Sequence, residues 1–431
     1  MEHFTGAQPI ANTAAGTRGS AGPLVIVTTL FFMWGLLTSL NDVLIPHLKS
    51  VYTLSYVQAM LVQFCFFGAY FIASLPAGVL VKRIGYQNGV VAGLAMAALG
   101  CALFYPAAHA GYGVFLLAFF TLACGITILQ VAANPFVTAL GDPRTASSRL
   151  TLTQAFNSLG TAIAPVLGGL LILGSGVLEP AAVTNLSLPE QAAYRAQQAA
   201  SVQMPYLLLA GALLLIAIVF ACVRLPKLDT GARSAGDVEP PMSLLSHWHL
   251  VLGTGAIFAY VGAEVSIGSF LINFIGDPGV TALSPASAAH YVSYYWGGAM
   301  LGRFAGVIVM RVVSPGKALA FNAGCAILLV LFAVSAHGAP AMWSMIAVGL
   351  CNSIMFPAIF SMALRGLGVQ TGRGSGLLCM AIVGGAIVPF AQGLLADAMG
   401  VQPSFVIPAL CYAYVLYFGL RSVRHLNRSA A

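Results

Sequence analysis

Charged side chains are scarce in this sequence. Asp, Glu, Lys and Arg make up only 7% of its 431 residues, whereas 59% are hydrophobic. Soluble domains carry roughly a quarter charged residues, because their surface must be covered by groups that water solvates. The composition therefore excludes an ordinary soluble protein of this length.

The sequence also lacks the short motifs of enzymes and of nucleotide-driven pumps. It contains no HExxH zinc motif, no CxxC pair and no GxxxxGK[ST] phosphate loop. The net charge of +7 does not gather on a folded basic face with interleaved aromatics, as nucleic-acid binding requires. We therefore expect no enzymatic activity, no cofactor, no bound metal and no nucleic-acid partner.

Long apolar runs are what the sequence has instead. Segments of about 20 apolar residues recur along the whole chain, which is the length that crosses a bilayer as a helix, and they lack the short alternation of a transmembrane barrel. The chain is therefore predicted to be an all-α polytopic membrane protein with twelve transmembrane helices. Their approximate limits are 24–48, 57–81, 87–108, 112–140, 147–174, 204–224, 249–275, 288–313, 317–336, 340–366, 374–399 and 403–421.

Composition also divides the chain into domains. Residues 1–23 are predicted to be a disordered cytoplasmic tail, since they are rich in Gly, Ala, Thr and Ser and lack a signal peptide. Residues 225–246 hold the only sizeable cluster of mixed charge with Pro and Gly, which predicts a linker between six-helix bundles at 24–224 and 247–421. Residues 422–431 form a second cytoplasmic tail.

Basic residues fix the predicted orientation. If the N-terminus is cytoplasmic, fifteen Lys and Arg residues flank the inside ends of the spans, against only Lys49 and Arg195 outside. Cytoplasmic loops carry this excess of positive charge. Both termini and the linker are therefore expected in the cytoplasm, with the protein in a cell membrane, most simply a bacterial inner membrane.

The two halves contain similar segments in the same order. AGVLVKRI at 77–84 recurs as AGVIVMRV at 305–312, and PVLGGLL at 165–171 is echoed by PFAQGLL at 389–395. NPFVTALG has a looser echo in FPAIFSMALRGLG. Two pseudo-symmetric six-helix bundles around a central midplane site are the plan of secondary transporters whose halves rock against each other.

Several of these segments also resemble a known family. FFMWGLLTSLNDVLIPHLK, LQVAANPFV, LTQAFNSLG, YVGAEVSIGSFL and MAIVGGAIVPFAQGLLAD resemble the fucose/galactose/glucose:proton symporter family of the major facilitator superfamily. The resemblance covers roughly residues 24–420 and implies the major facilitator fold, a hexose-like substrate and coupling to an inward ion gradient. Gln130 stands where fucose-type members tend to carry an acid. Together with Glu264, this favours the glucose/galactose branch.

Ionisable residues within the spans are few, and we interpret them as functional. An ionisable side chain costs at least about 2.5–3.5 kcal/mol in the hydrocarbon layer, so it usually faces a cavity. Asp42, roughly 9 Å inside the end of its span at Leu48, is predicted to couple transport to the ion. The alternative is that the first helix ends at Asn41 and the pair meets water outside.

Two further ionisable residues lie deep in the second half. Glu264 is a second coupling candidate, although a buried hydrogen bond between helices would also explain it. Arg303 lies about 12 Å inward from Arg311. It could pair with an acid in one conformation or extend towards the inside surface, and we favour a gating role.

Uncharged polar residues complete the predicted sugar site. Amides donate and accept hydrogen bonds without a charge, which matches sugar hydroxyls, although Asn and Gln also join helices in membranes. Trp34, Phe66, Tyr294 and Trp296 are candidates for packing on the sugar ring. The predicted substrate-binding residues are Asn41, Gln63, Gln130, Asn134, Gln154, Asn157, Asn273 and Asn352.

The sequence thus predicts a monomeric secondary transporter that imports a hexose-type sugar, glucose- or galactose-like, by proton symport. Fucose and an amino sugar are further candidate substrates. Sodium-coupled uptake remains an alternative, since a carboxylate among amide oxygens suits either ion. A facilitator or exporter of another small metabolite on the same fold also remains open.

Overall fold

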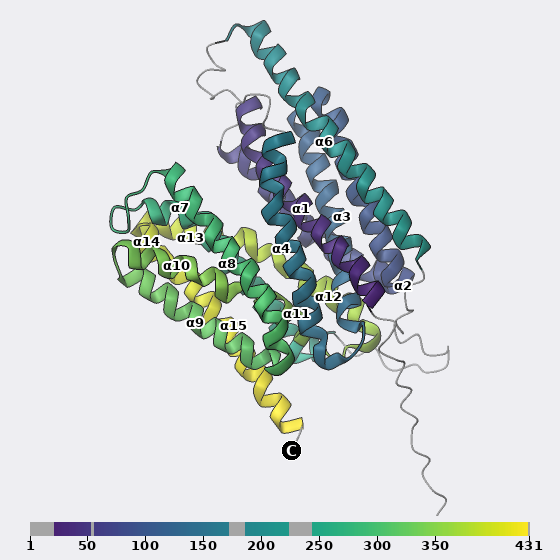
Figure 1. Cartoon of the computed structure of the whole chain (residues 1–431), viewed down its shortest axis with the longest axis vertical. Helices are drawn as coiled ribbons and strands as arrows, with labels where there is room; N and C mark the ends of the chain where they lie inside the picture. The colour runs from purple at the N-terminus through teal and green to yellow at the C-terminus, as the bar shows by residue number, and fades with distance from the viewer. Residues whose placement is uncertain (1–20, 53–55, 172–185, 224–243, 430–431) are drawn as a thin grey trace, which may run out of the picture.

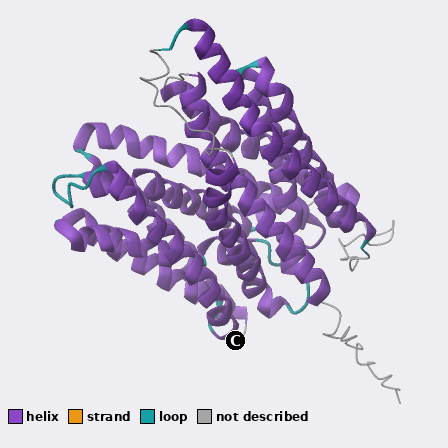
Figure 2. Ribbon diagram, turned by 45° about the horizontal axis from the view of Figure 1, so that its top comes forward, coloured by secondary structure: helices purple, strands orange, loops and turns teal. Residues whose placement is uncertain are grey.

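The computed structural model describes residues 21–52, 56–171, 186–223 and 244–429, and the described elements are all helical, with no strand among them (Figures 1 and 2). The predicted tail at 1–20 and most of the predicted linker, 224–243, lie outside the described residues. The limits predicted for the domains therefore stay predictions.

The helices fall into two groups, which we call the N bundle and the C bundle. The N bundle contains α1 (Ala21–Tyr52), α2 (Tyr56–Ala110), α3 (Tyr112–Ala139), η1 (Pro143–Thr145), α4 (Ala146–Leu171) and α6 (Leu188–Cys222). The C bundle contains η3 (Leu244–Ser246), α7 (Trp248–Gly276), α8 (Pro285–Val312), α9 (Pro315–Ser335), α10 (Gly338–Asn352), α11 (Met355–Ala363), η4 (Gly368–Gln370), α12 (Thr371–Met380), η5 (Ala381–Val383), α13 (Gly384–Met399), α14 (Val401–Ser404) and α15 (Val406–Ser429).

The helices have the length and apolarity of membrane spans. Among the described residues, nine are long and apolar enough to cross a bilayer. One of the nine windows, within α2, covers two predicted spans, because Gly85 has a φ of 81° and interrupts the helix between them. The more polar α4 and α8 are not among the nine. Adding them and both parts of α2 is consistent with the predicted twelve.

Helix α1 does not end at Asn41. It runs through Asn41 and Asp42 to Tyr52, so the alternative in which the helix stops before Asp42 is wrong. The side chains of Asn41, Asp42 and Gln63 lie outside the described part of the structure, and their predicted roles stay predictions.

Within the N bundle, α1 and α4 pack backbone against backbone. A Cβ atom on Gly35 would lie 1.9 Å from the backbone oxygen of Asn157, so only glycine permits this approach. Small residues bring membrane helices together in this way. The contact fixes α4 beside α1 at the depth of the cavity described below.

The two bundles meet mainly at one end of the molecule. α4 contacts α8 and α11, while α12 contacts α2 and α3; Figure 1 shows α11 and α12 at the junction of the two groups. These contacts lie near Arg149, Arg311 and Arg373, on the side predicted to be cytoplasmic. We call this set of contacts the inner gate.

Candidate functional site

A cavity of about 210 Å³ lies between the two bundles. This is smaller than the roughly 300–1,000 Å³ of pockets for drug-sized ligands, so it suits a small ligand. Its walls combine aromatic rings with amides and one acid–base pair. The lining residues are Trp34, Thr38, Phe66, Tyr70, Gln130, Gln154, Asn157, Tyr260, Val261, Glu264, Arg303, Phe356, Pro357 and Ile382.

Gln130 lines this cavity and carries an unused hydrogen-bond acceptor. Helix α3 carries it to the cavity wall, where it is only 3% exposed, and its Oε1 has no hydrogen-bond partner. Buried polar groups are nearly always paired. An unpaired amide oxygen at a cavity wall is therefore a candidate for binding a ligand donor.

Asn134 lies one helical turn beyond Gln130 and does not line the cavity. It is fully buried, and neither Nδ2 nor Oδ1 has a hydrogen-bond partner. The two amides were predicted to share a face, yet the structure brings only Gln130 to the cavity.

The amides of α4 line the cavity from the other side. Gln154 and Asn157 both belong to the lining. Asn157 also joins helices, since its Nδ2 donates to the backbone oxygen of Phe31 in α1 at 3.0 Å. One of its two amide N–H donors is therefore already used, and the second N–H and Oδ1 are left to consider for a ligand.

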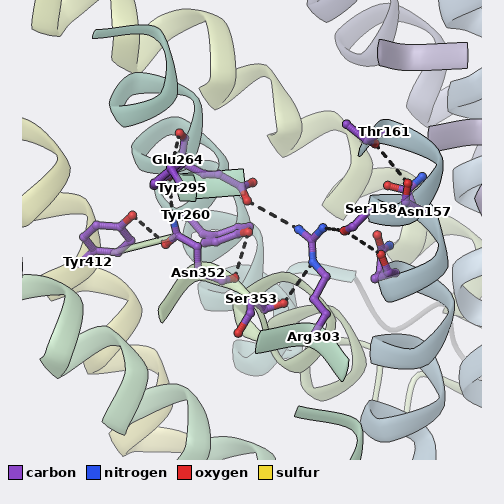
Figure 3. A network of polar contacts seen from close by, with 11 residues as sticks. Asn157, Ser158, Thr161, Tyr260, Glu264, Tyr295, Arg303, Asn352, Ser353 and Tyr412 are labelled. Carbon is purple, nitrogen blue, oxygen red and sulfur yellow. Dashed lines mark hydrogen bonds and ion pairs between the residues drawn. The ribbon is translucent and has the colours of Figure 1, made fainter. Parts of the chain in front are cut away.

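Glu264 and Arg303 form an ion pair at the cavity, with 3.6 Å between Oε1 and Nη2 (Figure 3). Each side chain is 13% exposed. Arg303 also donates from Nη1 to the hydroxyl of Ser158 in the N bundle. The guanidinium thus connects Glu264 of the C bundle with the N bundle. Of the two arrangements predicted for Arg303, the structure shows the one in which it pairs with an acid.

Helix chemistry explains the third contact of Arg303. Its Nε donates to the backbone oxygen of Ser353 at 3.3 Å. Pro357 follows Ser353 by four residues and has no N–H to donate back to that oxygen. The proline and the break between α10 and α11 therefore leave a carbonyl free to orient the guanidinium.

A buried network of three tyrosines around Asn352 lies next to this ion pair (Figure 3). The sequence did not predict this network. Asn352 donates from Nδ2 to the Tyr295 hydroxyl at 2.8 Å and accepts from the Tyr412 hydroxyl at 2.7 Å. Tyr260 donates to the backbone oxygen of Asn352 at 3.2 Å. Asn352 thus uses both its amide nitrogen and its amide oxygen within the C bundle, and it does not line the cavity.

One signal could have found part of this network. Tyr260 precedes Glu264 by four residues, so both lie on one face of α7, and both line the cavity. Tyr295 and Tyr412 come from α8 and α15 and had no comparable signal in the sequence.

Three of the other predicted residues lie outside the cavity lining. Asn273 is exposed on α7. Of the four predicted aromatics, Trp34 and Phe66 line the cavity. Tyr294, 58% exposed, packs against Trp343, and Trp296 packs against Tyr295.

Metal binding has no support in the described ranges, where no three His, Cys, Asp or Glu side chains gather into a possible metal site. The side chains that line the cavity can instead bind a small polar molecule. An unpaired amide, an ion pair and aromatic rings provide it, at the interface of two bundles.

Comparison with known proteins agrees with this arrangement. Residues 27–382 match the family described as Major Facilitator Superfamily. The chain is 55% identical to a glucose/galactose transporter of Brucella abortus biovar 1 (strain 9-941), with 96% of this chain and 97% of the relative covered. It is 37% identical to an L-fucose-proton symporter of Escherichia coli (strain K12), with 94% of each covered.

A solved structure shows the same fold. The crystal structure of the transporter FucP in the outward conformation superimposes with a TM-score of 0.87 at 34% sequence identity, covering 94% of this chain and 99% of that one.

Proposed function

Because the chain belongs to the Major Facilitator Superfamily, a family of transporters and not of enzymes, we propose that it imports a hexose-type sugar by cation symport. Relatives that carry glucose/galactose transporter and L-fucose-proton symporter names support the substrate class and the proton. The stronger identity to the glucose/galactose transporters favours glucose or galactose over fucose. The protein acts in a cell membrane, with both termini in the cytoplasm.

The observation that carries the proposal is Gln130 in its cavity. A buried amide oxygen without a hydrogen-bond partner is costly unless a ligand supplies the missing donor. A sugar hydroxyl supplies that donor, and Trp34 and Phe66 offer apolar faces to the ring. No charge on the substrate is needed.

The position of the cavity supports alternating access. The inner gate closes one side of the interface between the bundles, and the fold is similar to that of a transporter in its outward conformation. Sugar entering from outside binds at Gln130, and opening of the inner gate then releases it to the cytoplasm. Each bundle moves as a unit in this scheme.

Ion coupling is assigned to Asp42 and Glu264. Glu264 faces Arg303, which also contacts Ser158 of the opposite bundle. A proton on Glu264 would remove the carboxylate charge and free Arg303 from the pair. Asp42 in α1 precedes Glu264 by 222 residues, close to the offsets of 228 and 224 between the repeated segments. It remains the first candidate for the coupling carboxylate.

Uptake into proteoliposomes tests the proposal. The purified protein is supplied with glucose, galactose, fucose, mannose and N-acetylglucosamine, each under an inward proton gradient, an inward sodium gradient or neither. We expect accumulation of glucose or galactose under the proton gradient only.

The other outcomes identify the alternatives. Accumulation that requires sodium would indicate sodium-coupled uptake, and equilibration without accumulation would indicate a facilitator. If none of the sugars enters or exchanges under any gradient, sugar transport is ruled out and an exporter of another metabolite becomes the next candidate.

A further inference from the structure

A hydrogen bond between the bundles lies directly beside Gln130. The hydroxyl of Ser375 on α12 donates to the backbone oxygen of Val131 on α3 at 2.9 Å. Val131 is the residue after Gln130, and Ser375 is fully buried. The bond thus joins the helix that carries the candidate sugar ligand to the opposite bundle.

Pro135 explains why the Val131 oxygen is free to accept. In an α-helix that oxygen would receive the N–H of the residue four positions later. Residue 135 is a proline, which has no N–H. The sequence NPF therefore creates an acceptor in the middle of α3, and the C bundle fills it.

Backbone contacts on both sides of Ser375 hold its hydroxyl in place. A Cβ on Gly376 would lie 2.6 Å from the backbone oxygen of Ser74, and a Cβ on Gly78 would lie 2.8 Å from that of Gly372. Helices α2 and α12 therefore pack backbone against backbone at these glycines. The Ser375 bond is part of the inner gate and is shielded from water.

The second half also contains a backbone oxygen that a proline four residues later leaves free. Pro357 frees the backbone oxygen of Ser353, and Arg303 donates to it while also contacting Ser158 of the N bundle. Val131 and Ser353 precede their prolines by the same four residues. In both repeats, a carbonyl freed by proline thus accepts a side chain that lies at the interface of the bundles.

Helices α2 and α3, which α12 contacts, also bury polar groups without hydrogen-bond partners. Both side-chain atoms of Asn134 and the hydroxyl of Ser74 are buried without partners. Each such group costs free energy while it stays buried and unpaired. The stability of the gate therefore depends on the few bonds that cross it.

We propose that Ser375 is a latch of the inner gate. Its bond to Val131 holds the gate closed while the cavity is open to the outside, and the bond breaks each time α12 leaves α3 to release the substrate. Ser375 is thus a positioning residue that touches no substrate. This inference rests on the proposed function only in requiring alternating access; the identity of the sugar does not enter.

The distance between the bundles at their inner ends tests the latch. Spin labels are attached at exposed Arg144 and Arg365, each replaced by Cys in a variant whose native cysteines have been removed. Electron–electron resonance in reconstituted protein without sugar then gives the ratio of gate-open to gate-closed populations. Ser375→Ala should raise this ratio about fivefold, as expected for one net hydrogen bond.

A buried serine within one bundle provides the matched control. Ser344 donates to the backbone oxygen of Leu329 at 2.8 Å, and both lie in the C bundle. Ser344→Ala should lower thermal stability by a similar amount while leaving the population ratio unchanged. An equal shift in this control would mean that Ser375→Ala acts through general loosening, and it would overturn the latch.

Pro135→Ala weakens the same hydrogen bond at its acceptor, the Val131 oxygen. It tests the proposal even if Ser375→Ala does not fold. The restored N–H of residue 135 competes with Ser375 for the Val131 oxygen, so this variant should also shift the ratio towards the open gate. An unchanged ratio in whichever of these variants folds refutes the proposal. Because the measurement needs no substrate, it can succeed even if no tested sugar is transported.

Discussion

Gln130 and Asn352 occupy corresponding positions in the two halves but have different roles. They are separated by the same number of residues as Asp42 and Glu264, so they correspond in the two halves. Asn352 is held by Tyr295 and Tyr412, whereas Gln130 lines the cavity and its Oε1 has no hydrogen-bond partner. The repeat supplies two equivalent amides, and their neighbours decide that one organises the C bundle and the other remains available to a ligand.

This difference predicts opposite effects of two substitutions. Gln130→Ala removes one hydrogen bond to the sugar, worth about 0.5–1.5 kcal/mol, and should weaken sugar affinity about two- to twelvefold with little change in thermal stability. Isothermal titration or tryptophan quenching with each transported sugar measures the affinity. Unchanged affinity for all of them would show that Gln130 does not contact the substrate.

Asn352→Ala serves as the contrasting variant. It leaves the buried Tyr412 hydroxyl without its acceptor and removes the amide that donates to the Tyr295 hydroxyl. An unpaired buried group costs about 1–3 kcal/mol, so we expect a lower melting temperature in detergent. A variant that melts normally but loses affinity would instead make Asn352 a direct ligand.

Asp42 carries the coupling prediction. Asp42→Asn imitates the protonated carboxyl in shape and charge, so the variant should still exchange labelled for unlabelled sugar across a proteoliposome membrane. It should fail to accumulate sugar under a proton gradient. Retained accumulation would transfer the coupling role to Glu264, and loss of exchange would indicate a role in sugar binding or folding.

At the scale of helices, interruptions by proline and close contacts at glycine position the functional groups. Proline within α3 and α11 frees a carbonyl, and the break between α10 and α11 lies beside Arg303. Glycine acts differently, because it lets α2 and α12 meet at their backbones. The AGV segment repeated in the two halves includes Gly78, so the repeat found in the sequence contributes to the inner gate.

Substitution at this contact should open the gate. A Cβ on Gly78 would lie 2.8 Å from the backbone oxygen of Gly372. The resulting overpacking costs about 1–3 kcal/mol in the closed state only. Gly78→Ala should therefore shift the labelled Arg144→Cys/Arg365→Cys pair towards the longer distance by fivefold or more.

Gly68→Ala is the control on the same helix. Nothing lies within 4 Å of a Cβ built on Gly68, so the same substitution there should leave the distance distribution unchanged. Equal behaviour of the two variants would show that the close contact at Gly78 does not control the gate.

The molecule as a whole is organised by the bilayer. Backbone groups are paired within helices, because lipid offers them no partners, and the large apolar side chains exposed on helices such as α6, α9 and α15 fit a lipid-facing surface. The inner gate lies near Arg149, Arg311 and Arg373. The charge asymmetry in sequence and the closed end of the structure therefore coincide.

Labelling from outside intact cells tests the orientation. Single cysteines are introduced at Ala193, which is exposed near the start of α6, and at Asp237 in the predicted linker, in a variant without native cysteines. Position 193 leaves the capping contacts between Ser187 and Glu190 intact. A membrane-impermeant maleimide should react at 193 but not at 237, and the reverse pattern would invert the topology.

The sequence by itself determined the membrane class, the helical fold, the family resemblance and the deep positions of Glu264 and Arg303. These follow from composition, from segment length and from the cost of charge in lipid, all of which are local or additive along the chain. It also supplied the amides as candidates, but it could not say which of them were already used.

The tertiary structure decided that question. Whether Gln130 is free, Asn352 engaged or Asn134 covered depends on partners from helices far away in sequence, such as Tyr412 for Asn352. The pairing of Arg303 and the bond from Ser375 to Val131 likewise require two segments to meet across the bundles. A hydrogen bond depends on distances of a few tenths of an ångström, and only the packing of the whole chain sets those distances.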